Sequence, residues 1–170
     1  MMNDEMKSSR KARPRRPGQF IIHNSSFSIF SWRVRVYYED TDLGGVVYYA
    51  NYLKFLERAR TEWLRALGVE QTALAAEHRV IFVVRSIALE YLKPAAFNDE
   101  LVVTVELEES GAVQIRLLQR ITRGADELAT ARVRIACVNT ATFRPVRIPN
   151  NLSAALGRQV VKAKPPEDLE

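Results

Sequence analysis

The chain has 170 residues, of which 47% are hydrophobic and 26% charged, an ordinary composition for one soluble domain with tails. No apolar run approaches the roughly 20 residues of a membrane span, and the first eighteen residues lack the apolar core of a signal peptide. The only cysteine, Cys137, rules out an intrachain disulfide, and we interpret it as a small buried side chain rather than a nucleophile. We therefore expect a cytoplasmic protein.

The net charge of +5 is concentrated in residues 1–18, where six basic and two acidic residues give +4 and leave +1 for the rest. This segment has no apolar period and contains two prolines, so we expect a disordered basic arm. Such an arm could hold nucleic acid or an anionic membrane surface, although we favour a solvated tail or a gene start placed too far upstream. Residues 19–30 are apolar but interrupted, which favours a short N-terminal extension, either an extra strand or a packed arm.

A strand is predicted over residues 32–38 and a long helix over 49–67. The helix has apolar residues at the i, i+3, i+4, i+7 spacing of one buried stripe. These positions are Tyr52, Leu53, Leu56, Ala59, Trp63, Leu64 and Leu67. Gly68 is typical of the residue just past a helix, and residues 70–78 predict a short second helix.

From residue 80 onward the chain is rich in strand signals. Residues 80–92 are too continuously apolar for an exposed strand. Three further strands are predicted at 101–108, 112–122 and 127–139, so that, with 80–92, four strands follow one another in meander spacing. A short helix at 151–158 and a charged tail at 159–170 come after them. Short turns predict antiparallel pairing, and a helix with one apolar stripe predicts an α+β domain over 31–158 whose sheet wraps around that helix.

The most informative stretch is VYYEDTDLGGVVYYANY, residues 36–52, which indicates a strand, an acidic loop with two glycines, and a helix. Such a loop can place a carboxylate beside the free N–H groups at a helix start. A carboxylate can attack a carbonyl carbon or activate a water, and the N–H groups can hold the oxyanion that results. Asp, Thr and Gly are also turn residues, so Asp40 or Thr41 could serve only to bind the local backbone, and composition alone does not decide.

Residues 33–65 strongly resemble the 4-hydroxybenzoyl-CoA thioesterase superfamily, most of all its Tol–Pal-associated acyl-CoA thioesterase branch. The shared motif stands here as Asp40, Thr41, Asp42, Gly45, Val47, Tyr48 and Tyr52. Residues 57–65 and 82–95 are also similar to that branch, and the resemblance covers roughly residues 31–150. It implies a hotdog fold, in which an antiparallel sheet wraps around a long central helix, and hydrolysis of an acyl-CoA thioester.

The resemblance also implies roles for individual residues. The second aspartate of the motif, Asp42, would be the nucleophile or the general base, whereas Asp40 is better suited to fixing the loop. The oxyanion donor would be the backbone N–H of Tyr49. Glycine lets the chain approach a ligand closely, and the expected substrate-binding residues are Gly45, Val47 and Tyr48.

This chain departs from the branch at Tyr49, where the branch usually has histidine. Tyrosine normally titrates near ~10 and cannot replace an imidazole as an acid or base near neutrality. A non-catalytic acyl-CoA or acyl-carrier binding module therefore remains the alternative. A dehydratase of this fold would need a catalytic histidine at or near the start of the helix, and His23 and His78 both lie outside the motif. Arg85, in the apolar strand 80–92, is a candidate for a structural ion pair or a phosphate contact.

The expected partners are an acyl-CoA substrate, a second copy in a homodimer or homotetramer with active sites at the subunit interface, and acyl carrier protein. We expect no metal or other cofactor, because the sequence contains no cluster with metal-ligand spacing. It also lacks the G-x-S-x-G and G-x-x-x-x-G-K-[ST] motifs of serine hydrolases and NTPases. The preferred acyl chain is left open.

Overall fold

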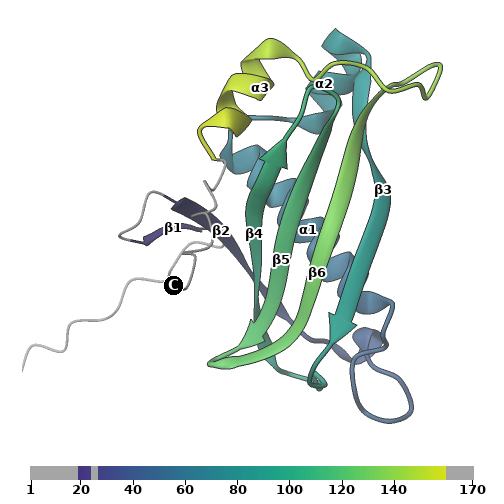
Figure 1. Cartoon of the computed structure of the whole chain (residues 1–170). Coiled ribbons are helices and arrows are strands. Elements are labelled where there is room, and N and C mark those ends of the chain that lie inside the picture. Colours follow the sequence, from purple (N-terminus) through teal and green to yellow (C-terminus); the bar gives the residue numbers. More distant parts are fainter. Residues whose placement is uncertain (1–18, 24–26, 160–170) are drawn as a thin grey trace, which may run out of the picture.

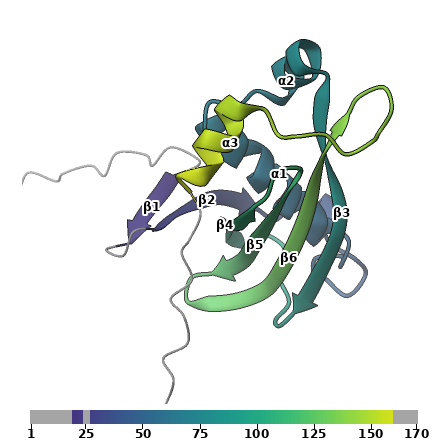
Figure 2. The ribbon, with the colours of Figure 1, turned by 45° about the horizontal axis from the view of Figure 1, so that its top comes forward.

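One antiparallel sheet curves around a long helix, α1 (Asn51–Ala66), in the computed structural model, which describes residues 19–23 and 27–159 (Figure 1). The predicted α+β fold, with a sheet wrapped around a central helix, is confirmed. The two short helices, α2 (Gln71–His78) and α3 (Asn150–Gly157), lie at the same end of the sheet (Figures 1 and 2). No helix in the described ranges has the length and apolar character of a membrane span.

The described strands form a six-stranded sheet in the order β1-β2-β4-β5-β6-β3. Their bounds are β1 (Gln19–His23), β2 (Phe27–Arg35), β3 (Val80–Tyr91), β4 (Glu100–Ser110), β5 (Gln114–Arg123) and β6 (Asp126–Asn139). The meander prediction is right for β4, β5 and β6 but wrong for β3, which pairs with β6 at the far edge. The connection from β3 to β4 is instead held by the acidic loop, through a bridge between Val46 and Ala96.

The first predicted strand has different bounds in the structure. β2 begins at Phe27 and ends at Arg35, and β1 pairs with it. Of the predicted extension, residues 19–23 therefore form an extra strand and residues 27–30 belong to β2. Tyr38 lies in a 3-10 turn (Tyr38–Asp40) instead of the strand, because the carboxylate of Asp40 accepts the N–H of Tyr37 and turns the chain. The predicted basic arm (1–18) and residues 160–170 of the predicted tail lie outside the described residues.

Helix α1 fills the concave side of the sheet with the predicted apolar stripe, shifted slightly around the helix. Its buried residues are Asn51, Tyr52, Phe55, Leu56, Ala59, Trp63 and Leu64. Leu53 was predicted to be buried but is 40% exposed, because it lies about 100° around the helix from Tyr52, near the margin of the buried face. Phe55, on the other margin, is fully buried.

On the sheet opposite, Cys137 is buried as predicted, and burial raises the pKa of its thiol.

Strand β3 is more exposed than its composition predicts. It forms an edge of the sheet, and Val84 is 49% exposed. Arg85 lies at a bulge between Val84 and Ser86, is exposed, and makes no ion pair with any described residue. The prediction of a covered strand is therefore wrong for the described part of a single chain, in which no strand pairs with this edge.

Replacing Phe55 with alanine tests the packing of α1. We expect Phe55→Ala to lower the free energy of unfolding by about 3–5 kcal/mol, because the cavity left behind cannot fully collapse. Lys54→Ala, at the exposed neighbouring position, should change it by less than about 0.5 kcal/mol. Urea unfolding at one fixed protein concentration measures both, and similar midpoints for the two variants would contradict the buried placement of Phe55.

Candidate active site

The acidic loop is a tight turn closed by backbone hydrogen bonds. Thr41 bridges to Val47, the N–H of Asp42 donates to the carbonyl of Val46 at 2.9 Å, and that of Gly45 donates to the carbonyl of Asp42 at 3.0 Å. Gly45 has a φ of +75°, in the left-handed region that side chains disfavour. The glycine is therefore required by the turn itself.

Asp40 holds this loop against the start of α1. Its side chain is 4% exposed, and its carboxylate accepts the N–H of Tyr37 at 2.9 Å. Its carbonyl accepts two further bonds, from the N–H of Tyr48 at 2.8 Å and the side-chain amide of Asn51 at 2.9 Å. Asp40 thus has the loop-fixing contacts expected of it, and its buried carboxylate is not presented to a substrate.

Asp42 is exposed, and only one of its carboxylate oxygens is bound within the chain. Oδ1 accepts the N–H of Gly44 at 2.8 Å, whereas Oδ2 has no hydrogen-bond partner among the described residues. One oxygen therefore stabilises the turn, as the simple turn interpretation expects of this loop. The other is free to meet a ligand.

Two backbone N–H groups are free where α1 begins. The residues before the helix are Tyr49 and Ala50, and neither N–H has an acceptor among the described residues. Free N–H groups at a helix start carry partial positive charge and favour a developing negative charge nearby. They are suitable donors for an oxyanion.

A cavity of about 330 Å³ brings the acidic loop and the helix start together. Three predicted site residues line it, namely Asp42, Val47 and Tyr49. The other two predicted residues, Gly45 and Tyr48, do not. The Tyr48 ring lies beside that of Tyr49, with centroids 4.6 Å apart, and this neighbour raises the pKa of the Tyr48 hydroxyl.

A second segment of the lining, residues 91–94 at the end of β3, was not predicted from the sequence, nor were Val46 and Tyr52. Residues 91–94 lie in the second stretch that resembles the family, but alternation along a strand does not show which segment its end will meet.

Lys93 adds positive charge to the cavity, and its ammonium pairs with Asp126 at 2.5 Å. This pair lowers the pKa of the Asp126 carboxyl.

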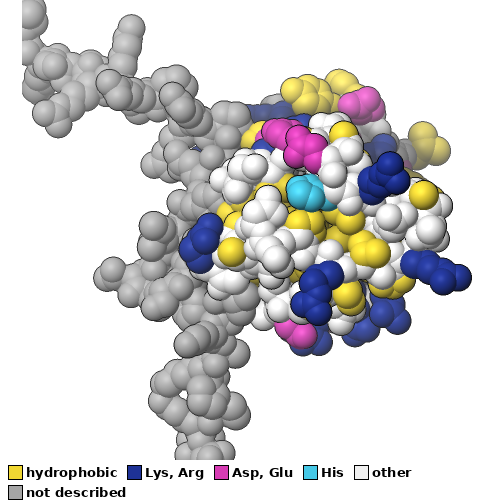
Figure 3. Space-filling model, turned by 90° about the horizontal axis from the view of Figure 1, so that it is seen from above, with side chains coloured by type: hydrophobic (Ala, Val, Ile, Leu, Met, Phe, Trp, Pro, Cys, Tyr) yellow, Lys and Arg dark blue, Asp and Glu magenta, His cyan; other side chains and the backbone are white. Residues whose placement is uncertain are grey.

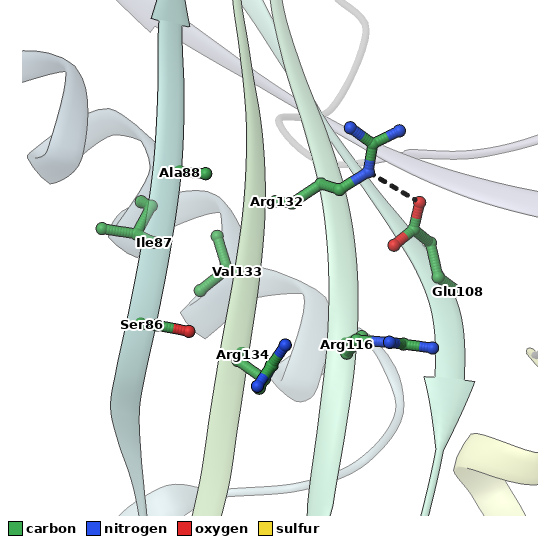
Figure 4. A pocket seen from close by; sticks show the side chains of 8 residues that line it. All are labelled: Ser86, Ile87, Ala88, Glu108, Arg116, Arg132, Val133 and Arg134. Atoms are coloured by element: carbon green, nitrogen blue, oxygen red, sulfur yellow. Dashed lines mark ion pairs between the residues drawn. The ribbon is translucent and has the colours of Figure 1, made fainter.

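A second hollow, of about 380 Å³, lies on the outer face of the sheet, away from α1 (Figure 4). Its carboxylate, Glu108, is paired with Arg132 at 3.6 Å, and Arg116 is paired with Glu109. No helix begins there to supply free N–H groups. The chemistry of acyl transfer therefore points to the cavity beside α1.

His78 is distant from that cavity along the chain. It is the last residue of α2, which lies at the end of the molecule viewed in Figure 3, and β3 begins two residues later at Val80. The twelve residues of β3 separate it from Tyr91 by roughly 35 Å along the strand. In the described part of the chain, no three His, Cys, Asp or Glu side chains gather as metal ligands would.

The turn conformation of Gly45 can be tested by adding one methyl group. We expect Gly45→Ala to destabilise the fold by about 1 kcal/mol or more, because the left-handed backbone is strained for alanine even though no atom blocks the methyl. Gly157→Ala is the matched control, since that position is equally open and its φ is not positive. Thermal unfolding would contradict the strained turn if both variants melted alike.

Known proteins match this chain over most of its length. The model of the Thioesterase-like superfamily matches residues 36–156. The acyl-CoA thioesterase YbgC of Haemophilus influenzae is 46% identical over 126 residues, which cover 74% of this chain and 93% of that protein. The acyl-CoA thioester hydrolase YbgC of Escherichia coli O6:H1 is 44% identical over 128 residues, covering 75% and 95%.

Solved structures show the same architecture. A probable thioesterase from Bartonella henselae aligns with a TM-score of 0.69 at 35% identity, covering 71% of this chain and 99% of that one. A 1,4-dihydroxy-2-naphthoyl-CoA thioesterase from Synechocystis aligns with a TM-score of 0.71 at 21% identity, covering 76% and 96%, and supports the fold alone. The chain belongs to the thioesterase-like superfamily, whose hotdog fold the sequence motif had implied.

Proposed function

We propose that this protein is an acyl-CoA thioesterase, which hydrolyses the thioester bond to a free acid and CoA. The observation that carries the proposal is the shared cavity, which is lined both by Asp42, whose Oδ2 is free, and by Tyr49, which lies two residues before the helix. The relatives named as acyl-CoA thioesterases match three-quarters of the chain at 44–46% identity.

The reaction needs one group to act on the carbonyl carbon and another to stabilise its oxygen. The N–H of Tyr49 would bind the thioester oxygen and stabilise the negative charge that develops there. Asp42 would then attack the carbon, forming a mixed anhydride that water hydrolyses, or would deprotonate a water that attacks it. In both routes the carbon–sulfur bond breaks, and the CoA thiolate leaves and takes up a proton.

The tyrosine at position 49 is compatible with this mechanism. Its contribution is a backbone N–H, which any residue except proline supplies at that position. Its side chain is 62% exposed and is not required to transfer a proton. The proposal therefore does not need the histidine that related enzymes of the branch usually carry.

We further propose that the enzyme is a homodimer joined through β3. This twelve-residue edge strand leaves one side of its backbone without a strand partner in the described chain, and exposes apolar side chains such as Val84. Long apolar edges favour pairing with another strand, and a second copy would extend the sheet across the two chains. The adjoining cavity residue Leu92 is 53% exposed and would be covered at the same time.

The resemblance also predicts a cytoplasmic location, pairing of dimers into a homotetramer, a link to the Tol–Pal system, and acyl carrier protein as a partner. A free, buried Cys137 fits a reducing compartment. These remain parts of the proposal. None of them affects the chemistry assigned to Asp42.

The catalytic assignment is tested with Asp42→Asn. We expect acyl-CoA hydrolysis to fall by about 10²–10⁴, because an amide is neither a base nor an effective nucleophile. Release of free thiol from a panel of acyl-CoAs measures the rate. Glu77→Gln, the same chemical change at an exposed position on α2, is the control and should keep full activity.

Wild-type rates in Asp42→Asn would overturn the assignment. A wild-type protein that binds acyl-CoA without releasing thiol would instead favour a binding module.

The dimer is tested by placing a charge on the β3 edge. We expect Val84→Lys to shift the protein from dimer to monomer, because a second copy of the lysine would meet the first in an apolar interface. Val113→Lys makes the same change at another exposed valine, in the turn between β4 and β5, and should remain dimeric. Sedimentation velocity distinguishes the states, and a monomeric wild-type protein would refute this interface.

A further inference from the structure

Tyr91 connects the end of β3 to the start of α1. Its hydroxyl donates to the carbonyl of Tyr49 at 2.8 Å, across 42 positions of sequence. Its ring packs edge-on against Tyr52, with centroids 5.2 Å apart and planes at 79°. The Tyr52 hydroxyl in turn accepts the N–H of Ala95 at 3.0 Å, so the tyrosine pair is fixed to both segments that form the cavity.

The Tyr49 carbonyl depends on this hydrogen bond because the first turn before α1 is irregular. In a regular helix it would accept the N–H of Leu53, four residues later. Here that N–H donates to the carbonyl of Ala50 at 3.2 Å, a tighter three-residue turn. Among the described residues, the Tyr91 hydroxyl is therefore the hydrogen-bond donor to this carbonyl.

Fixing a carbonyl also fixes the N–H of the same peptide, because the peptide group is planar. The carbonyl of Tyr49 shares its peptide with the N–H of Ala50. The preceding peptide, which carries the N–H of Tyr49, is fixed by a bond from the N–H of Asn51 to the carbonyl of Tyr48 at 2.8 Å. Both peptides are thus anchored at their carbonyls, and both N–H groups remain without acceptors in the described chain.

We propose that Tyr91 is a positioning residue for thioester hydrolysis, whose hydroxyl holds the carbonyl of Tyr49 and so fixes the N–H of Ala50, the neighbour of the Tyr49 N–H that would bind the substrate carbonyl. The inference rests on the proposed function. Tyr91 acts through the backbone and takes no part in bond making. Burial, with Tyr52 and Tyr49 as neighbours, raises the pKa of its hydroxyl, which therefore keeps its proton at neutral pH.

Tyr91→Phe removes the hydroxyl and keeps the ring that packs on Tyr52. We expect kcat to fall about tenfold with KM within about twofold, a smaller loss than the ~10²–10³ that follows removal of an oxyanion donor. Tyr38→Phe is the control, because Tyr38 is 75% exposed and does not line the cavity. Its ring stacks on that of Phe97, with centroids 3.8 Å apart, and this contact does not need the hydroxyl. An unchanged kcat in Tyr91→Phe overturns the proposal.

A binding experiment isolates the carbonyl contact without turnover. One non-hydrolysable acyl-CoA analogue is a ketone, in which CH₂ replaces sulfur and the carbonyl is kept. The other is a thioether, which lacks the carbonyl oxygen. We expect Tyr91→Phe to weaken binding of the ketone several-fold while leaving that of the thioether unchanged. Equal weakening of both, or of neither, contradicts a role in fixing the N–H of Ala50 for contact with the carbonyl oxygen.

A second substitution separates the hydroxyl from the ring. Tyr91→Leu loses both, and a loss of kcat similar to that of Tyr91→Phe supports the hydroxyl as the group that matters. Full activity in Tyr91→Phe with a loss confined to Tyr91→Leu would assign the effect to ring packing and overturn the inference. If the wild-type protein hydrolyses acyl-CoA and Asp42→Asn does not, such a result refutes the role of Tyr91 alone. A wild-type protein that neither cleaves nor binds acyl-CoA refutes the proposed function, and the role of Tyr91 with it.

Discussion

The hydrogen bonds of Asp40 are the constraint on which the geometry of the site depends. Its carboxylate accepts a hydrogen bond from the chain where β2 has just ended. Its carbonyl accepts bonds from the N–H of Tyr48, shortly before α1, and from the side chain of Asn51, the first residue of α1. Because Asp40 is almost fully buried, leaving any of these groups unpaired would carry a desolvation cost. The loop between strand and helix is therefore held in one conformation, in which Asp42 and Tyr49 line the same cavity.

A second set of contacts joins this local unit to a distant part of the chain. The N–H of Val47 donates to the carbonyl of Ala95 at 2.8 Å, and Tyr91 and Tyr52 add side-chain bonds between the same two segments. The connection from β3 to β4 thereby becomes one wall of the cavity. The acidic loop brings Asp42 to this cavity, and the end of β3 supplies the facing surface and a hydrogen bond to the carbonyl of Tyr49.

The apolar character of β3 follows from the same architecture. A strand with continuous valine and isoleucine is normally covered on both faces, yet β3 lies at the edge of the sheet with Val84 half exposed. The unpaired edge and the solvent-exposed cavity residues lie on neighbouring parts of the surface. A second copy of the chain would cover both, which relates the oligomeric state in our proposal to the formation of a complete site.

Sequence alone determined the features that depend on residues close together in the chain. The 3.6-residue period predicted α1, and the motif in residues 36–52 indicated that Asp42 and Tyr49 would lie close together, because a loop and the helix that follows it are adjacent by necessity. Only the tertiary structure placed β3 beside β6 and brought Tyr91 and Lys93 into the cavity. Apolar alternation shows that a strand has a buried face but does not show which strand lies beside it. The hydrogen bond from Tyr91 to Tyr49 joins residues 42 positions apart, so it forms only after the sheet has closed around the helix.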